Sequence, residues 1–223
     1  MSMIPDKPPF KLLDILYKKE FILFVVLITI LIINSNLTPY FLDLYNLIDS
    51  TFLFSEKAII ALTMTFVIIA RQIDLSVASI IAVSSVVLGY TTSLGYDTWL
   101  IISLTLLSGA LCGAFNGAII TKFAIPSIIV TIGTMSLFRG LAYSFLEDSY
   151  YNKFPKIVSN LGSGYLFGYI PYAFLTFILL ALVFAFILHK TTVGKKIFSI
   201  GNNPDAAQYT GIAVDKYTFV LFT

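Results

Sequence analysis

Cysteine, histidine and charged residues are all scarce in this sequence. Its 223 residues include one cysteine (Cys112), one histidine (His189) and 12% charged residues, whereas soluble domains carry about 25% charged residues. A single cysteine excludes an internal disulfide, and with a single histidine we expect no metal site. So little charge cannot cover the surface of a soluble domain of this length. The small net charge of +2 gives no indication of nucleic-acid binding.

Apolar residues are correspondingly abundant. They make up 58% of the chain, and the mean hydropathy is +0.91. The apolar residues occur in continuous runs rather than in alternation with polar ones, which disfavours a transmembrane β-barrel. We therefore predict an all-α polytopic membrane protein.

The apolar runs predict six complete transmembrane helices and the start of a seventh. Residues 1–20 form a basic tail, and residues 35–57 are expected to hold a short helix along the membrane surface. Lysine and arginine concentrate in alternate loops, which places the tail and the loop 189–216 in the cytoplasm. We expect one transmembrane domain over 1–223, truncated at its C-terminus because it stops within a helix. The predicted spans are 17–34, 57–70, 75–95, 98–120, 125–146 and 169–188, followed by 217–223.

The segment Arg71–Ile80 interrupts the longest apolar region. Between Ala58 and Tyr96 the only formal charges are Arg71 and Asp74. One helix over these residues would be about 58 Å long, nearly twice a hydrocarbon core of about 30 Å. The interruption is either a tight turn at the membrane surface or a broken helix inside the bilayer. An ion pair between Arg71 and Asp74, three residues apart, fits both interpretations.

The helix predicted over 98–120 carries a stripe of small residues. Gly109, Gly113 and Gly117 recur every four residues and therefore share one helix face, where another helix can approach closely. Asn116 lies beside this stripe, and it either supports the packing or faces a pathway.

Arg139 is the only charged residue within the next predicted helix. It follows Pro126 by thirteen positions, which corresponds to about 20 Å along a helix axis. Its side chain either extends to the membrane surface or forms a structural ion pair, or it faces a water-filled cavity and contacts substrate.

The loop 189–216 contains the signals of a short, capped helix. Asn203 is a favourable N-cap, and Pro204 suits the first helical position. Ala206 and Ala207 propagate the helix, and Gly211 can end it in the left-handed conformation. A helix of under two turns is not stable alone, so we interpret it as a docking surface for a cytoplasmic partner in preference to an ordinary ordered loop.

Several of these segments, in this order, resemble the membrane permease subunits of bacterial ABC sugar importers of the ribose, xylose, arabinose, rhamnose and autoinducer-2 type. The resemblance covers about Ala58 to Ile212. It is carried by Ile73-Asp74-Leu75-Ser76-Val77-Ala78-Ser79, Phe115-Asn116-Gly117, Ile125-Pro126-Ser127, Thr131-Ile132-Gly133-Thr134, Gly201-Asn202-Asn203, Ala206-Ala207 and Gly211-Ile212.

The resemblance implies a multi-pass permease of the bacterial inner membrane that forms the path of a monosaccharide. The implied partners are a second permease subunit, a cytoplasmic ATP-binding protein and a periplasmic or lipid-anchored sugar-binding protein. ATP would be hydrolysed by the partner, and the chain has no phosphate-binding G-x-x-x-x-G-K-[ST] motif, so we expect neither enzymatic activity nor a cofactor. The residues implied to couple to the ATPase are Asn203, Pro204, Ala206, Ala207 and Gly211, and the candidate pathway residues are Asp74, Ser76, Asn116 and Arg139.

One departure from the family pattern concerns the substrate. Many relatives carry two glycines where this chain has Arg71-Gln72, and the Arg71 form is closer to the rhamnose and autoinducer-2 type permeases. The residues alone do not identify the sugar.

Three alternatives remain open from the sequence. An ion-coupled carrier would need buried carboxylates in several helices, and Asp74 is the only acid within the predicted apolar runs. A membrane-embedded enzyme would need paired acidic or histidine residues at one depth. A non-functional fragment of a permease is the third.

Overall fold

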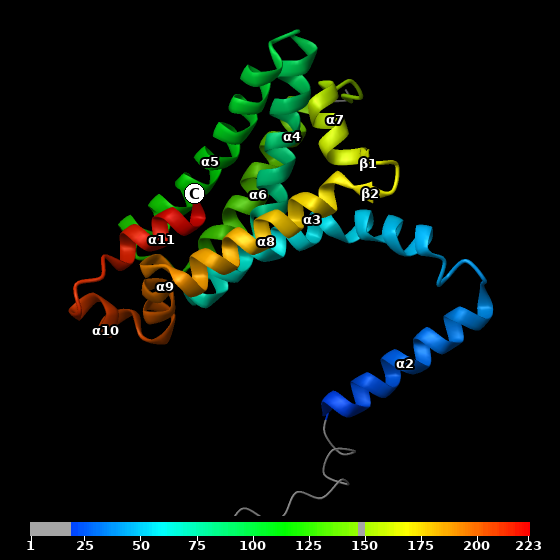
Figure 1. The fold of residues 1–223 in the computed structure, drawn as a ribbon. Coiled ribbons are helices and arrows are strands. Elements are labelled where there is room, and N and C mark those ends of the chain that lie inside the picture. The colour runs from blue at the N-terminus through cyan, green and yellow to red at the C-terminus, as the bar shows by residue number, and fades with distance from the viewer. Residues whose placement is uncertain (1–18, 147–149) are drawn as a thin grey trace, which may run out of the picture. The chain divides into compact units, whose positions relative to one another are not determined.

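The computed structural model describes residues 19–146 and 150–223, which form helices and one small hairpin (Figure 1). The hairpin pairs β1 (Tyr165–Leu166) with β2 (Ile170–Pro171) in antiparallel register. Most of the predicted tail 1–20 lies outside the described residues. The helices are α2 (Lys19–Leu37), α3 (Leu44–Ile69), α4 (Val77–Ser93), α5 (Thr98–Phe123), α6 (Ser127–Leu146), α7 (Lys156–Ser163), α8 (Tyr172–Lys190), α9 (Thr192–Asn202), α10 (Pro204–Tyr209) and α11 (Val214–Phe222).

Five of the described helices are long and apolar enough to cross a membrane: α2, α3, α5, α6 and α8. The apolar helix α4 is shorter, with 17 residues. Each of these six helices overlaps one of the predicted spans. The all-α, multi-pass membrane class predicted from the composition is confirmed.

The predicted division of residues 35–70 into a surface helix and a separate span is wrong. A single helix, α3, runs without a break from Leu44 to Ile69, so Glu56 and Lys57 lie within it. No glycine or proline occurs between its ends, and glutamate and lysine are good helix formers. Two adjacent charges therefore do not end this helix.

The chain divides into two compact units, Met1–Ser50 and Thr51–Thr223. In the first, α2 buries none of its residues and is apolar on every side, as expected of a helix surrounded by lipid. In the second, α3 and α8 run side by side (Figure 1) and contact one another through aromatic rings, with 5.1 Å between the centroids of Phe66 and Phe184. Helices α4, α5 and α6 form a separate group in the second unit.

The two helix groups of the second unit meet near the end of α3. Val67 of α3 packs there in a buried cluster with Ile120, Val130 and Phe222, from α5, α6 and α11. A second buried cluster joins Ala70 to Ile197, Ile200 and Ala207 of α9 and α10. We call this end of the second unit, where α9 and α10 lie, the α10 end.

Glycines allow the closest helix approaches. A side chain at Gly113 or Gly117 would collide with the backbone of α11, at Phe222 and Phe219 respectively, and Gly109 faces Ser84 of α4. The glycine stripe of α5 thus serves two neighbouring helices. Gly201 of α9 is equally constrained, because its missing side chain leaves room for the carbonyl oxygen of Ile69 at the end of α3.

We predict that Gly113→Ala lowers the free energy of unfolding by about 1–3 kcal/mol, because the added methyl group meets backbone that cannot rotate away. The measurement is an SDS titration of the purified chain in detergent micelles. Gly133→Ala on α6 is the matched control, since nothing lies within 4 Å of the position its methyl group would take. It should be neutral or stabilising by up to about 1 kcal/mol. Equal destabilisation by both changes would contradict the close contact.

Candidate functional site

The segment between α3 and α4 begins with a strained helix end. The amide of Arg71 donates to the carbonyl of Ile68 (2.9 Å) and that of Gln72 to the carbonyl of Val67 (3.0 Å), which is the Schellman pattern of helix termination. Arg71 occupies its left-handed position, with φ of 59°. Glycine is the usual residue there, and another residue type costs about 1–2 kcal/mol.

From residue 72 to residue 76 the chain has no regular secondary structure, and its backbone is bonded by side chains of α6. The amide of Ile73 donates to the Ser127 hydroxyl (3.1 Å), and the Thr131 hydroxyl lies 3.3 Å from the carbonyl oxygen of Ile73. Thr131 also donates to its own helix at Ser127 (2.8 Å). Non-helical backbone at membrane depth needs such protein partners, because lipid provides none.

A buried polar network follows this segment. The Asp74 carboxylate accepts from both the amide and the hydroxyl of Ser76, at 2.8 and 2.6 Å. The Asn116 amide of α5 donates to the same hydroxyl at 2.8 Å. Ser76 and Asn116 are fully buried and Asp74 is 9% exposed. Three of the four predicted pathway residues therefore form one hydrogen-bonded chain.

The ion pair between Arg71 and Asp74, which either interpretation of the sequence allowed, is not formed. Asp74 directs its carboxylate to Ser76, and Arg71 is exposed. Helical spacing brings residues three apart together only inside a helix, and the left-handed turn at Arg71 removes that geometry.

Two buried polar atoms near this network lack a partner among the described residues. They are Oδ1 of Asn116 and Oγ of Ser79, one turn beyond Ser76 on α4. Leaving a buried acceptor unbonded costs about 1–3 kcal/mol.

Asp74 and Arg139 line the same cavity. This cavity, of about 520 Å³, lies between α3 on one side and α4 and α6 on the other, and Glu56 is its third charged lining residue. Glu56 precedes the end of α3 by thirteen residues, or about 20 Å, and Arg139 follows Ser127 by twelve, or about 18 Å. Because Ser127 is bonded next to Asp74, the cavity runs from Asp74 near the α10 end to Glu56 and Arg139 at its other end. We call it the charged cavity.

A second cavity, of about 400 Å³, shares Arg139 and continues away from the α10 end. Its walls include Tyr143, Tyr150, Tyr151 and Phe154. Aromatic faces next to a guanidinium group can hold a polar ligand that also has an apolar face.

Glu56 is the lining residue that sequence reasoning missed. The predicted surface segment 35–57 includes Glu56, so Asp74 is the only acid within the predicted apolar runs. The available signal was the lack of a helix breaker from Leu44 to Ile69, which makes Glu56 an acid within a long helix. Acids in such positions are uncommon and usually functional.

At the α10 end, the short capped helix has the predicted form. Asn203 accepts from the amide of Ala206 (3.1 Å), Pro204 is the first helical residue, and Gly211 has φ of 85°. Ala207 is 4% exposed and packs on Ile197 and Ile200, so its side chain holds α10 in place and is not accessible to a partner.

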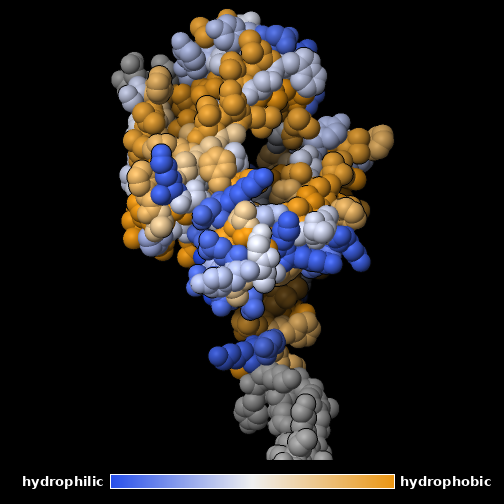
Figure 2. All heavy atoms as spheres, turned by 90° about the vertical axis from the view of Figure 1, so that its left-hand side faces the viewer, coloured by the Kyte–Doolittle hydropathy of each residue, from blue (hydrophilic) through white to orange (hydrophobic). Residues whose placement is uncertain are grey.

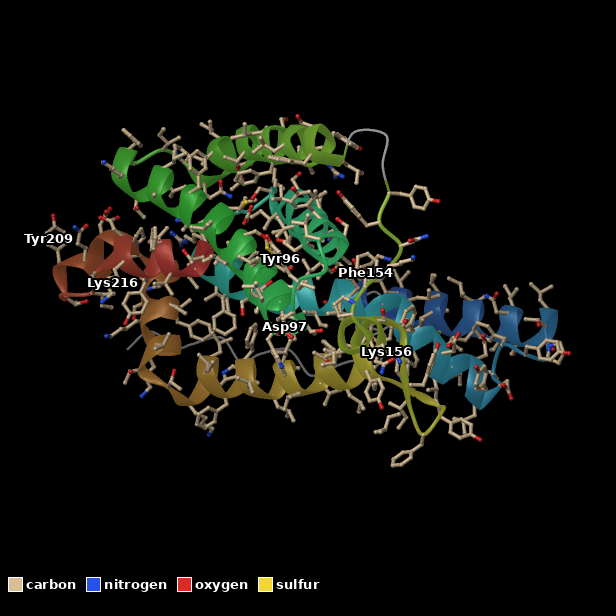
Figure 3. All side chains as sticks on the ribbon, turned by 90° about the horizontal axis from the view of Figure 1, so that it is seen from above. Tyr96, Asp97, Phe154, Lys156, Tyr209 and Lys216 are labelled. Carbon is tan, nitrogen blue, oxygen red and sulfur yellow. The ribbon has the colours of Figure 1, made fainter. Side chains whose placement is uncertain are left out.

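Tyr209 was not singled out in the sequence, although it is the most accessible apolar side chain of this region. It is 91% exposed and projects from α10 away from the helices behind it (Figure 3). Asn203, Pro204 and Ala206 are exposed beside it. Figure 2 shows hydrophilic residues gathered over this end of the molecule.

Comparison with known proteins gives a consistent result. The family model described as "Branched-chain amino acid transport system / permease component" matches residues 46–223. The chain is 34% identical over 209 residues to the autoinducer 2 import system permease protein LsrD of Klebsiella pneumoniae, covering 91% of this chain and 63% of that protein. It is 32% identical over 206 residues to the ribose import permease protein RbsC of Haemophilus influenzae, covering 89% and 62%.

The chain thus spans a little under two thirds of the length of these relatives. No solved structure matches it.

We predict that Ser76→Ala lowers the free energy of unfolding by about 1–3 kcal/mol, because it leaves the buried Asn116 amide without its acceptor and removes one of the two donors to Asp74. Ser79→Ala is the matched control: both serines are fully buried, but the Ser79 hydroxyl is unbonded. Its removal should be neutral or stabilising. Thermal unfolding in detergent measures both variants, and an equal loss in both would contradict the network.

Proposed function

The chain belongs to the transporter permease family that includes the autoinducer 2 and ribose import permeases, and we propose that it lines the path of a monosaccharide through the bacterial inner membrane. In this proposal it is one permease subunit of an ATP-driven importer, with six spans and a cytoplasmic N-terminus. A second permease subunit, an ATP-binding protein and a sugar-binding protein complete the importer.

The observation that carries the proposal is the charged cavity. Glu56, Asp74 and Arg139 come from three separate elements and line one space. Charged groups are costly within a membrane and are kept where a polar solute or water is present. Carboxylate and guanidinium groups can bond the hydroxyl groups of a sugar as acceptors and donors respectively.

Ser76 and Asn116 have a supporting role in this proposal. They are fully buried behind Asp74 and hold its carboxylate in position while Asp74 faces the cavity. Arg139 also lines the second cavity, of about 400 Å³, where the apolar face of a sugar ring can stack on the aromatic walls.

The cavity also suits a second substrate class, the zwitterionic amino acid. The matching family model is described by branched-chain amino acid transport, and a carboxylate facing a guanidinium would bind an ammonium and a carboxylate group respectively. The 32–34% identity to sugar-type permeases favours the monosaccharide.

Uptake measurements in the native host test the pathway. We predict that Asp74→Asn, Arg139→Gln and Glu56→Gln each reduce uptake of radiolabelled D-ribose about tenfold or more, since a hydrogen bond to a charged group contributes about 1.5–3 kcal/mol. Lys57→Gln is the control, because Lys57 neighbours Glu56 but does not line the charged cavity. Immunoblots confirm equal membrane levels.

L-Leucine uptake is measured in the same strains. If the variants lose leucine uptake while ribose uptake is unchanged, the proposed substrate is an amino acid and not a sugar. Unchanged uptake of both in all three variants would reject the charged cavity as the path.

We propose that α10 is the coupling helix that docks on the ATP-binding protein, with Tyr209 as its principal contact and Asn203, Pro204 and Ala206 beside it. An exposed aromatic side chain on a small rigid helix is typical of residues that dominate interfaces. Ala207 and Gly211 maintain the helix behind this surface.

We predict that Tyr209→Ala weakens capture of the ATP-binding protein by about tenfold or more, the effect of losing an interface residue worth 2 kcal/mol. Tyr169→Ala is the control, since Tyr169 is also an exposed tyrosine but lies in the turn between β1 and β2. Pull-down from detergent extracts measures both. Equal capture by the two variants would show that α10 does not dock through Tyr209.

A further inference from the structure

A third cavity lies at the α10 end, and of the residues discussed above it shares Ile197 and Gly211. It measures about 380 Å³ and is enclosed by α9, the linker after α10 and α11. Two lysines, Lys196 and Lys216, line it together with the ring of Tyr217 and the apolar side chains of Val193, Val220 and Leu221. We call it the lysine pocket.

The charged side chains that line the lysine pocket are all positive. Lys196 is half-buried, and its Nζ lies 5.4 Å from the centroid of the Tyr217 ring, a cation–π contact that holds the ammonium group in place. No acidic side chain is among its described lining residues. Asp215 and Asp205, the acids nearest in sequence, are exposed outside that lining. The pocket therefore attracts an anion.

The apolar wall extends to membrane depth. α11 crosses α5 with Phe219 at Gly117 and Phe222 at Gly113. These glycines lie six and ten residues before the end of α5, or about 9 and 15 Å inside it. Val220 and Leu221 are therefore level with the interior of a membrane-crossing helix, whereas Lys216 is one turn nearer the surface.

Two lysines beside an apolar wall suit a ligand that has an anionic group and an apolar chain. We infer that the lysine pocket binds the headgroup of an anionic phospholipid, with the phosphate between Lys196 and Lys216 and an acyl chain along Val220 and Leu221. Basic pockets at helix ends on the cytoplasmic side are suited to such headgroups. Val220 and Val193 are 60% and 41% exposed, as an acyl chain requires.

Two other ligands fit the pocket less well. Free phosphate would use the lysines but leave the apolar wall unoccupied. An acidic segment of a protein partner would be expected against the outward face of α10, whose residues Asn203 to Tyr209 are absent from the pocket lining. The inference does not depend on the transported substrate.

Native mass spectrometry of the full chain in detergent tests the inference, with phosphatidylglycerol and phosphatidylcholine as probes. Lys196→Gln combined with Lys216→Gln should weaken phosphatidylglycerol binding about tenfold or more, since each lysine near a lipid surface contributes roughly a fivefold preference for anionic lipid. Phosphatidylcholine binding should not change.

The matched control combines Lys190→Gln with Lys195→Gln, which removes the same charge from the same region outside the pocket lining. It should change phosphatidylglycerol binding less than twofold. Val220→Ser separates the two anion sources: it should weaken phosphatidylglycerol binding without affecting competition by inorganic phosphate.

Three results would overturn the inference. They are equal binding of the two lipids by the wild-type chain, equal losses in the two double variants, and complete displacement of the lipid by millimolar inorganic phosphate. Unfolding curves that coincide for all variants ensure that a loss of binding is not a loss of structure.

Discussion

Inside a membrane no water is available to hydrogen-bond free backbone amides and carbonyls, so the protein itself must provide their partners. The arrangement of the second unit depends on how the backbone of Gln72–Ser76 obtains these partners. The Ser127 hydroxyl bonds the amide of Ile73, and the Asp74 carboxylate bonds the amide of Ser76. Asn116 then ties Ser76 to α5. These bonds bring α4, α5 and α6 around one segment, and they leave Asp74 facing the charged cavity.

Much of this could be predicted from the sequence, because the dominant signals are local. The apolar runs predict where the long helices lie, and the Asn203-Pro204 pair predicts where α10 begins. The lack of glycine and proline between Leu44 and Ile69 favours the continuous α3, but the cavity that Glu56 faces is formed by helices distant in sequence and could not be predicted. An ion pair between Arg71 and Asp74 requires helical geometry, and Arg71, with φ of 59°, has left the helix.

The two ends of the second unit differ in how tightly their helices pack. Near the α10 end, Val67 and Ala70 are 4% and 2% exposed and lie in apolar clusters. Farther along α3, the charged cavity separates it from α4 and α6. Polar side chains can face a shared space only where the helices are apart, so the apolar clusters close that space at the α10 end.

The contact between Gly201 and the carbonyl oxygen of Ile69 has a mechanical consequence. Backbone meets backbone there, without a side chain that could rotate to absorb a displacement. The last turn of α3 and the helix α9 must therefore shift as one solid piece. Because Arg71 and residues 72–76 follow α3 directly, a displacement of α9 would pass through the end of α3 to the backbone that carries the Asp74 carboxylate.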